Sequence, residues 1–65
     1  MKIIWNEIND ETYESSLIDD NGIKYHLMDF NHDTDGWVGI SKGQEILAQL
    51  AQILNMEFIH QYQGE

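Results

Sequence analysis

Residues 12–30 read TYESSLIDDNGIKYHLMDF, and this stretch decides the fold expected for the chain. Two runs rich in apolar, aromatic and β-branched residues, 12–18 and 23–30, flank the polar stretch Asp19–Gly22. Such runs on either side of an Asn-Gly pair are typical of a β-hairpin, because Asn and Gly tolerate the positive φ angles of tight turns. The stretch therefore predicts two antiparallel strands joined at Asp19–Gly22.

The type of turn decides which side chains share a face of this hairpin. A two-residue type I′ turn at Asn21-Gly22 puts Tyr13 and Leu17 opposite a row of Lys24, His26, Met28 and Phe30. A type I turn over Asp19–Gly22, with Gly22 left-handed in a bulge, shifts the register by one and flips the faces. One face then holds Tyr13, Leu17, Ile23, Tyr25 and Leu27, and the other holds Glu14, Ser16, Lys24 and His26. We favour this second turn because it separates apolar from polar residues better, although it leaves on the polar face Ile18, Met28 and Phe30.

The segments on either side of the hairpin predict two further strands. Residues 1–8 alternate weakly, with Ile3 and Trp5 on one face and Ile4 and Ile8 on the other. Trp5 is expected to serve either as core or as an interface anchor. The polar residues 9–11 predict a turn and residues 31–36 a loop. Residues 37–40, WVGI, predict a short strand that places Trp37 in the core.

The C-terminal third predicts one amphipathic helix over residues 42–62, with Gly64 as its stop. Residues 41–44, SKGQ, match a capping box, in which Ser or Thr is followed three residues later by Glu or Gln. Apolar residues then recur at 46, 47, 50, 53, 54 and 58, which is helical spacing. The expected fold class is therefore α+β: a small antiparallel β-sheet of about four strands with one C-terminal amphipathic helix packed on it. Residues 1–65 form a single acidic domain whose other sheet face is exposed.

The charge of the chain is its most unusual property. Twelve Asp and Glu stand against three Lys and no Arg, which gives a net charge of −9. Such a field repels nucleic acid and anionic membranes and attracts basic protein surfaces. A folded chain is expected rather than a disordered one, because 42% of the residues are hydrophobic. No apolar run is long enough to span a membrane or to serve as a secretory signal, so we expect a soluble, intracellular protein.

Residues 31–36 are the clearest candidate for metal binding. Asn31, Asp33, Asp35 and Gly36 fall at positions 1, 3, 5 and 6 of an EF-hand loop, but position 12 is Lys42 instead of the bidentate Glu. We therefore expect the aspartates to cap a turn through hydrogen bonds to their own backbone, and Gly36 to supply a positive φ.

Other chemistry is not indicated by the sequence. The chain has no Cys, so neither a disulfide nor a thiolate zinc site can form. The three histidines lie far apart in the sequence and lack the spacing of zinc ligands; they are His26, His32 and His60. No activated nucleophile, distinct carboxylate pair or glycine-rich phosphate loop stands out. We expect no enzymatic activity, no cofactor and no metal.

The acidic residues are concentrated in one part of the chain. Nine of the twelve lie within residues 7–35, a stretch that holds a single Lys. Side chains on one face of a strand repeat every ~6.6 Å, which is of the order of the phosphate spacing along a nucleic-acid strand. Carboxylates here can therefore stand in for phosphates in a protein groove built for DNA or RNA. The expected partner-binding residues are Glu7, Asp10, Glu11, Glu14, Asp19, Asp20, Asp33 and Asp35.

Three other interpretations fit the same composition. The first is an immunity protein or antitoxin that covers a basic nuclease site. The second is a small acidic adaptor that binds through an apolar sheet face containing Ile18, Met28 and Phe30. The third is an acidic surface that serves solubility alone. A charge-matched inhibitor loses affinity steeply as salt rises, whereas an apolar adaptor does not.

The acid-rich segment 6–36, NEINDETYESSLIDDNGIKYHLMDFNHDTDG, together with the small size and the lack of Cys, suggests a relationship to a known class. The chain resembles the small phage-encoded inhibitors of bacterial defence, notably anti-CRISPR proteins that act as nucleic-acid mimics. This resemblance implies a basic nucleic-acid-binding partner in the cytoplasm of a bacterial host cell, for example a CRISPR surveillance complex. Inhibition would come from steric and electrostatic occupation of its nucleic-acid channel. We expect no direct nucleic-acid binding, no membrane association, and either a monomer or a homodimer.

Overall fold

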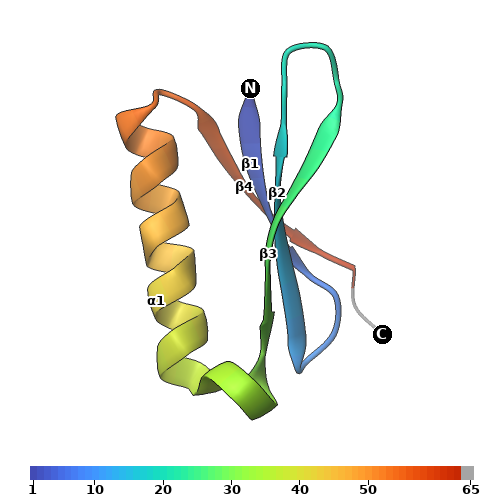
Figure 1. Ribbon diagram of the computed structural model, residues 1–65, viewed down its shortest axis with the longest axis vertical. Helices are drawn as coiled ribbons and strands as arrows, with labels where there is room; N and C mark the ends of the chain where they lie inside the picture. Colours follow the sequence, from blue (N-terminus) through green and yellow to red (C-terminus); the bar gives the residue numbers. More distant parts are fainter. Residues whose placement is uncertain (64–65) are drawn as a thin grey trace.

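The computed structural model describes residues 1–63, and Figure 1 shows one sheet with a long helix lying along one side of it. The elements follow in the order β1 (Lys2–Glu7), β2 (Thr12–Ile18), β3 (Lys24–Asn31), α1 (His32–Ile53) and β4 (Glu57–Tyr62). The strands form a single sheet in the order β3-β2-β1-β4. The predicted α+β domain with about four strands and one helix is confirmed.

The β2–β3 hairpin has the turn favoured from the sequence. The N–H of Gly22 donates to the carbonyl oxygen of Asp19 at 3.0 Å, and Gly22 has a φ of 84°. One carboxylate oxygen of Asp19 accepts the N–H groups of Asn21 and Ile23, both at 2.9 Å. These hydrogen bonds favour the ionised form of the Asp19 carboxylate and hold its pKa below the ordinary value. The bond from the N–H of Ile23 has the largest effect. The side chain of Asp19 therefore stabilises the turn that its backbone begins.

The register of this hairpin changes once, at a β-bulge. Near the turn, Ser16 pairs with His26, but its neighbour Ser15 pairs with Met28, so Leu27 is an extra residue on β3. The hydroxyl of Ser15 donates to the carbonyl oxygen of Met28 and accepts the N–H of Met28, both at 3.2 Å. This hydroxyl therefore takes the place of a ladder partner at the irregularity.

The bulge corrects the predicted faces of β3. The favoured register holds from Ile18 to Ser16 and leaves Ile18 on the polar face, as expected. Beyond the bulge the alternation is reset, so that Phe30 pairs with Tyr13 and faces the helix. The placement of Met28 and Phe30 on the polar face is therefore wrong, because one inserted residue reverses every side chain that follows it.

The helix begins ten residues earlier than predicted. Asn31 is its N-cap, and its side-chain oxygen accepts the N–H of Asp33 at 2.7 Å. The predicted loop 31–36 and the predicted strand 37–40 form the start of α1, with a break at Gly36, whose φ is 68°. A short run such as WVGI fits a strand or a buried helix segment equally well, so its periodicity could not decide between them. The capping box at 41–44 lies inside the helix and caps nothing.

The last predicted helical turns form a strand instead. Helix α1 ends at Ile53, and Asn55 follows it with a φ of 57°. Strand β4 then pairs parallel to β1. Lys2 lies beside Glu57 at one end of this pairing, and Glu7 lies beside Tyr62 at the other. In chain order the helix therefore comes after β3 and before β4, and it is not C-terminal as predicted. The sheet is mixed rather than purely antiparallel. Gly64, the predicted stop, lies outside the described residues.

The core lies between the sheet and α1. It is built from five buried side chains of the strands and the helix, with the partly buried Phe58 packed against them: Trp5, Tyr13, Phe30, Ile40 and Leu47. Trp5 is its centre, with ring centroids 5.1 Å from Phe30 and 5.7 Å from Tyr13. Trp5 is thus core, one of its two expected roles. Trp37, predicted as core, is 68% exposed because it belongs to the first turns of the helix.

Gly43 allows α1 to approach this core closely. A Cβ atom at this position would lie 2.5 Å from two ring atoms of Phe30, which is itself buried against Trp5. We expect Gly43→Ala to lower the free energy of unfolding by about 1–2 kcal/mol, since overpacking outweighs the gain in helix propensity of about 1 kcal/mol. Urea denaturation measures this change, and the exposed Ser41→Ala in the same helix serves as the control, with an effect within about 0.5 kcal/mol. A Gly43→Ala protein more stable than wild type would contradict the tight contact.

Candidate functional site

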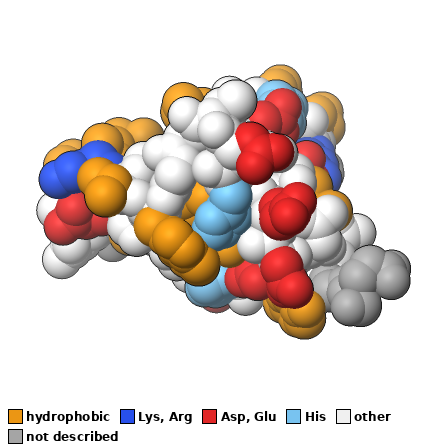
Figure 2. Space-filling model, turned by 90° about the horizontal axis from the view of Figure 1, so that it is seen from below, with side chains coloured by type: hydrophobic (Ala, Val, Ile, Leu, Met, Phe, Trp, Pro, Cys, Tyr) orange, Lys and Arg blue, Asp and Glu red, His pale blue; other side chains and the backbone are white. Residues whose placement is uncertain are grey.

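One end of the molecule gathers carboxylates from three segments. They come from the end of β1, from the β1–β2 turn and from the first turn of α1, and we call this group the acidic end: Glu7, Asp10, Glu11, Asp33 and Asp35. The N–H of His32 donates to the carbonyl oxygen of Glu11 at 3.0 Å, which joins the start of α1 to the β1–β2 turn. Figure 2 views the molecule from this end and shows several carboxylate side chains gathered on it.

Local hydrogen bonds hold these segments in place. The side-chain oxygen of Asn9 accepts the N–H groups of Glu11 and Thr12, at 2.8 and 2.9 Å, and so shapes the β1–β2 turn. A carboxylate oxygen of Asp35 accepts the N–H of Asn31 at 2.9 Å, reciprocating the cap that Asn31 gives to the helix. The expected positive φ at Gly36 is confirmed. The expectation that the aspartates cap this segment holds for Asp35, but the N-cap itself is Asn31, and the segment opens a helix.

The lysines of the chain lie away from the acidic end. Lys2 and Lys24 both pair with Ile18, next to the hairpin turn at the opposite end of the sheet. Lys42 lies within α1 and pairs with Glu45 at 3.7 Å. Within residues 1–63, the one ion-pair partner of a carboxylate at the acidic end is His60, which is charged only when protonated and whose Nε2 lies 3.8 Å from Glu7. This end therefore carries concentrated, weakly compensated negative charge.

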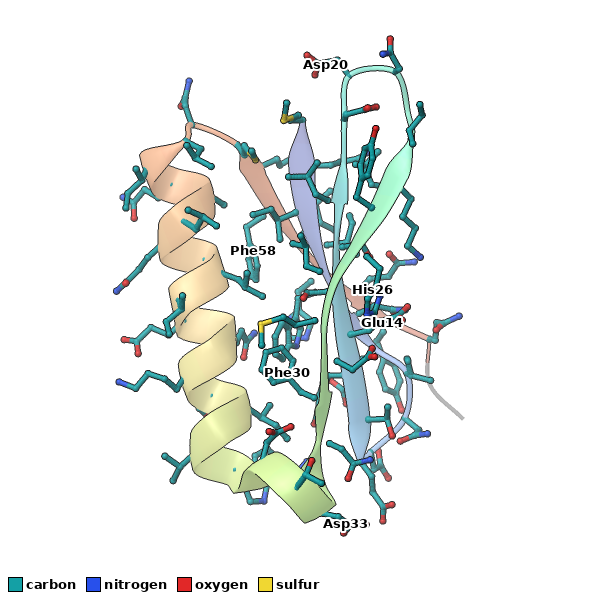
Figure 3. All side chains as sticks on the ribbon, viewed as in Figure 1. Glu14, Asp20, His26, Phe30, Asp33 and Phe58 are labelled. Carbon is teal, nitrogen blue, oxygen red and sulfur yellow. The ribbon has the colours of Figure 1, made fainter. Side chains whose placement is uncertain are left out.

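The structure separates three of the predicted contact residues from the other five. Asp19 and Asp20 lie at the hairpin turn, where Asp20 is 2.7 Å from the N-terminal amino group of Met1. Figure 3 shows Asp20 and Asp33 at opposite ends of the molecule, whose longest extent is 33 Å. Glu14 lies on the sheet face away from α1, beside Lys24 at 3.9 Å. The acid thus forms separate groups instead of one continuous row.

The sheet face turned away from α1, which we call the open face, contains a hollow of about 380 Å³. Its lining is mixed, with apolar, amide and charged side chains: Lys2, Ile4, Asn6, Glu14, Ser16, Ile18, Lys24, Ile59, Gln61 and Gln63. Two buried oxygens on this face, Oδ1 of Asn6 and Oγ of Ser16, have no hydrogen-bond partner within the described residues. Buried polar atoms are normally paired, so these two oxygens are exceptions within the described part of the chain.

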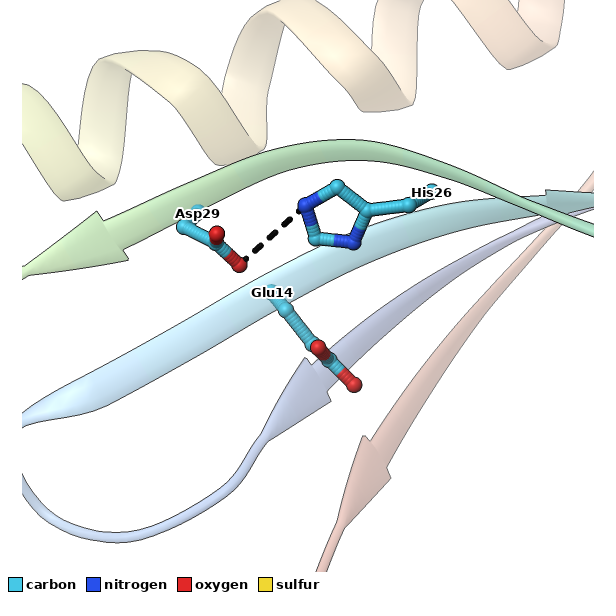
Figure 4. A group of neighbouring side chains, drawn as sticks. All are labelled: Glu14, His26 and Asp29. Atoms are coloured by element: carbon cyan, nitrogen blue, oxygen red, sulfur yellow. Dashed lines mark ion pairs between the residues drawn. The ribbon is translucent and has the colours of Figure 1, made fainter.

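Next to this hollow, three possible metal ligands lie close together, a group that the sequence analysis missed. Figure 4 shows Glu14 on β2 near His26 and Asp29, which point toward each other from β3. Nε2 of His26 is 3.3 Å from Oδ1 of Asp29, and one donor atom from each of the three residues lies within 4.8 Å of the others. Residues three apart on a regular strand point to opposite faces, but the bulge at Leu27 turns both His26 and Asp29 to the open face. The adjacent serines Ser15 and Ser16, which interrupt the alternation of β2, were the local sign of this irregularity.

Helix α1 and strand β3 also expose apolar side chains. In α1, Leu47 is buried, but Ile46, Leu50 and Ile53 are more than 40% exposed, so the prediction that the apolar helix residues form core holds only in part. Of the apolar residues assigned to an adaptor surface, Phe30 is buried and Met28 is 53% exposed. Any apolar binding surface is therefore dominated by the helix and not by the open sheet face.

No family model, no curated protein and no solved structure matches the chain. No helix among residues 1–63 is both long and apolar enough to cross a membrane. A functional proposal therefore rests on the geometry and charge of the surfaces described above.

Tyr13 reports on the negative potential of the acidic end. Burial raises the pKa of this phenol above its ordinary value of 10.0, and the charges of Glu7 and Asp10 raise it further. A group with a raised folded-state pKa contributes stability below its unfolded pKa and loses it as pH rises through the folded value. We expect the melting temperature to fall as pH rises above about 10, and to fall less in Tyr13→Phe.

Thermal melts from pH 8 to 11 measure this slope, and Tyr25→Phe, at an exposed tyrosine, is the matched control. The same slope in the wild type and in Tyr13→Phe would show that Tyr13 is not the group that ionises.

Proposed function

We propose that this protein is an acidic inhibitor that binds a basic protein surface through its acidic end and blocks it. The observation that carries the proposal is the convergence of Glu7, Asp10, Glu11, Asp33 and Asp35 from three segments at an end that the lysines avoid. Such an arrangement costs stability through self-repulsion, and a 65-residue fold has little stability to spare.

The mechanism is the replacement of phosphates by carboxylates. Carboxylate oxygens accept charge-assisted hydrogen bonds from Lys and Arg, as phosphate oxygens do. Of the five, Asp10, Glu11, Asp33 and Asp35 are exposed, but Asp35 also caps α1, and Glu7 is half-buried beside His60. Asp10, Glu11 and Asp33 are thus the exposed carboxylates without such a second contact among the hydrogen bonds and ion pairs of residues 1–63. These three therefore carry most of the contact, and the net charge of −9 speeds the encounter with a basic partner.

The partner class follows from this chemistry. A surface rich in Lys and Arg that accommodates a compact negative end is the kind that binds DNA or RNA. The finer form of the proposal, which rests on the resemblance to anti-CRISPR proteins, is a nucleic-acid mimic that occupies the channel of a bacterial CRISPR surveillance complex. An immunity protein or antitoxin over a basic nuclease site uses the same contacts and differs only in the partner.

A pull-down from bacterial lysate at low and at high salt, followed by mass spectrometry, tests the proposal. A nucleic-acid-binding protein or complex is expected at low salt and not at high salt, because the contacts are ionic. A nuclease as the sole partner would move the assignment to the immunity class. A partner that survives high salt and has no role with nucleic acid would overturn the proposal in favour of an apolar adaptor that uses α1.

Charge reversal then locates the contact. The double variant Asp10→Lys/Glu11→Lys is expected to weaken binding of the recovered partner by at least about tenfold, since opposing like charges cost several kcal/mol. Asp20→Lys/Glu57→Lys is the matched control, because it changes the net charge equally at exposed positions near the opposite end. Equal losses in both variants, measured by calorimetry at constant salt, would mean that overall charge and not the acidic end mediates binding.

A further inference from the structure

Two carboxylates lie opposite each other on the open face, and a bound cation would offset their repulsion. Glu14 and Asp29 are directly opposite each other on adjacent antiparallel strands, and like charges in that position destabilise a sheet. Lys24 lies 3.9 Å from Glu14, and the imidazole of His26, which is positive only when protonated, lies 3.3 Å from Asp29. The Lys24 and Asp29 side chains are both more than half exposed, so these pairs compensate the repulsion only weakly.

We propose that Glu14, His26 and Asp29 form a binding site for one divalent metal ion of the zinc class. One imidazole nitrogen and two carboxylate oxygens form a donor set that suits Zn²⁺ and its neighbours in the first transition row, whereas Ca²⁺ and Mg²⁺ prefer oxygen alone. Three protein ligands leave the remaining positions of the ion to water.

The distances fit such an ion after small side-chain movements. Ligand atoms about 2.1 Å from a tetrahedral zinc ion lie about 3.4 Å from one another. The pair formed by Nε2 of His26 and Oδ1 of Asp29 is already at 3.3 Å. All three donor atoms lie within 4.8 Å of one another, and the His26 and Asp29 side chains are 53% and 71% exposed, so closing the remaining gap meets little packing.

The surroundings of Glu14 complete the site. Nδ2 of Asn6 donates to a carboxylate oxygen of Glu14 at 3.3 Å and to Oε1 of Gln63 at 2.9 Å, which orients Glu14 in the manner of an outer-sphere partner. Oδ1 of Asn6 and Oγ of Ser16 are buried in the same face with no hydrogen-bond partner among residues 1–63, and Ser16 is the strand neighbour of His26. The site therefore has three ligands, a group that orients one of them, and two unpaired acceptors buried beside it.

The metal site is independent of the acidic end and is tested with the full chain and the metal alone. Calorimetric titration with Zn²⁺ is expected to show one ion bound per chain. When Co²⁺ is bound instead, we expect visible absorption bands from the metal, as for a site with a nitrogen ligand. His26→Ala is expected to weaken binding at least about tenfold and to remove the bands. His60→Ala is the matched control, because among residues 1–63 the one carboxylate in ion-pair contact with His60 is that of Glu7, at 3.8 Å, and it should leave both readouts unchanged.

A second pair of variants separates the site from diffuse attraction by the acidic surface. Lys24→Gln removes the ammonium that competes for Glu14, and Lys42→Gln makes the same charge change on α1. Only Lys24→Gln should tighten Zn²⁺ binding, by several-fold. Equal effects of the two lysine variants, unchanged binding in His26→Ala, or absence of binding by the wild type would each overturn the proposal.

Discussion

The β-bulge at Leu27 is the constraint on which the two faces of this small sheet depend. Along a regular strand the side chains alternate, so Tyr25 and Phe30 cannot both face the helix. The extra residue resets the alternation and returns Phe30 to the core, opposite Tyr13. The hydroxyl of Ser15 makes the irregularity tolerable, because it bonds both the N–H and the carbonyl oxygen of Met28.

The same inserted residue shapes the other face. It turns His26 and Asp29 to one side, against Glu14, and so creates the donor set of the proposed metal site. Bulges commonly occur where a side chain is re-aimed for function. Here one inserted residue both directs Phe30 into the core and places His26 and Asp29 on the open face.

The parallel pairing of β4 with β1 is the second determinant of the architecture. Since β1 pairs antiparallel with β2, and β2 with β3, the strands β3 and β4 run in the same direction. Joining them requires a crossover, and α1 fills it over one face of the sheet. Strand β1 thereby becomes internal, which buries Trp5, and Gly43 lets the helix approach Phe30. The pairing of Asn31 with Thr12 at the end of the β2–β3 ladder brings the first turn of α1 against the β1–β2 turn, which assembles the acidic end.

Local signals in the sequence were sufficient for the α+β class, for β1 and for the hairpin with its Asp19–Gly22 turn, because turn chemistry and alternation act over a few residues. They were not sufficient for the helix limits. Residues 37–40 and 57–62 are short stretches whose state depends on what they pack against, and Glu57–Tyr62 forms a strand by pairing with the edge of β1. The net charge was likewise fixed by composition, but the separation of the acidic end, the hairpin turn and the open face was decided by strand pairing and by the bulge. Pairing between separate segments and a single inserted residue leave no periodic trace along the chain.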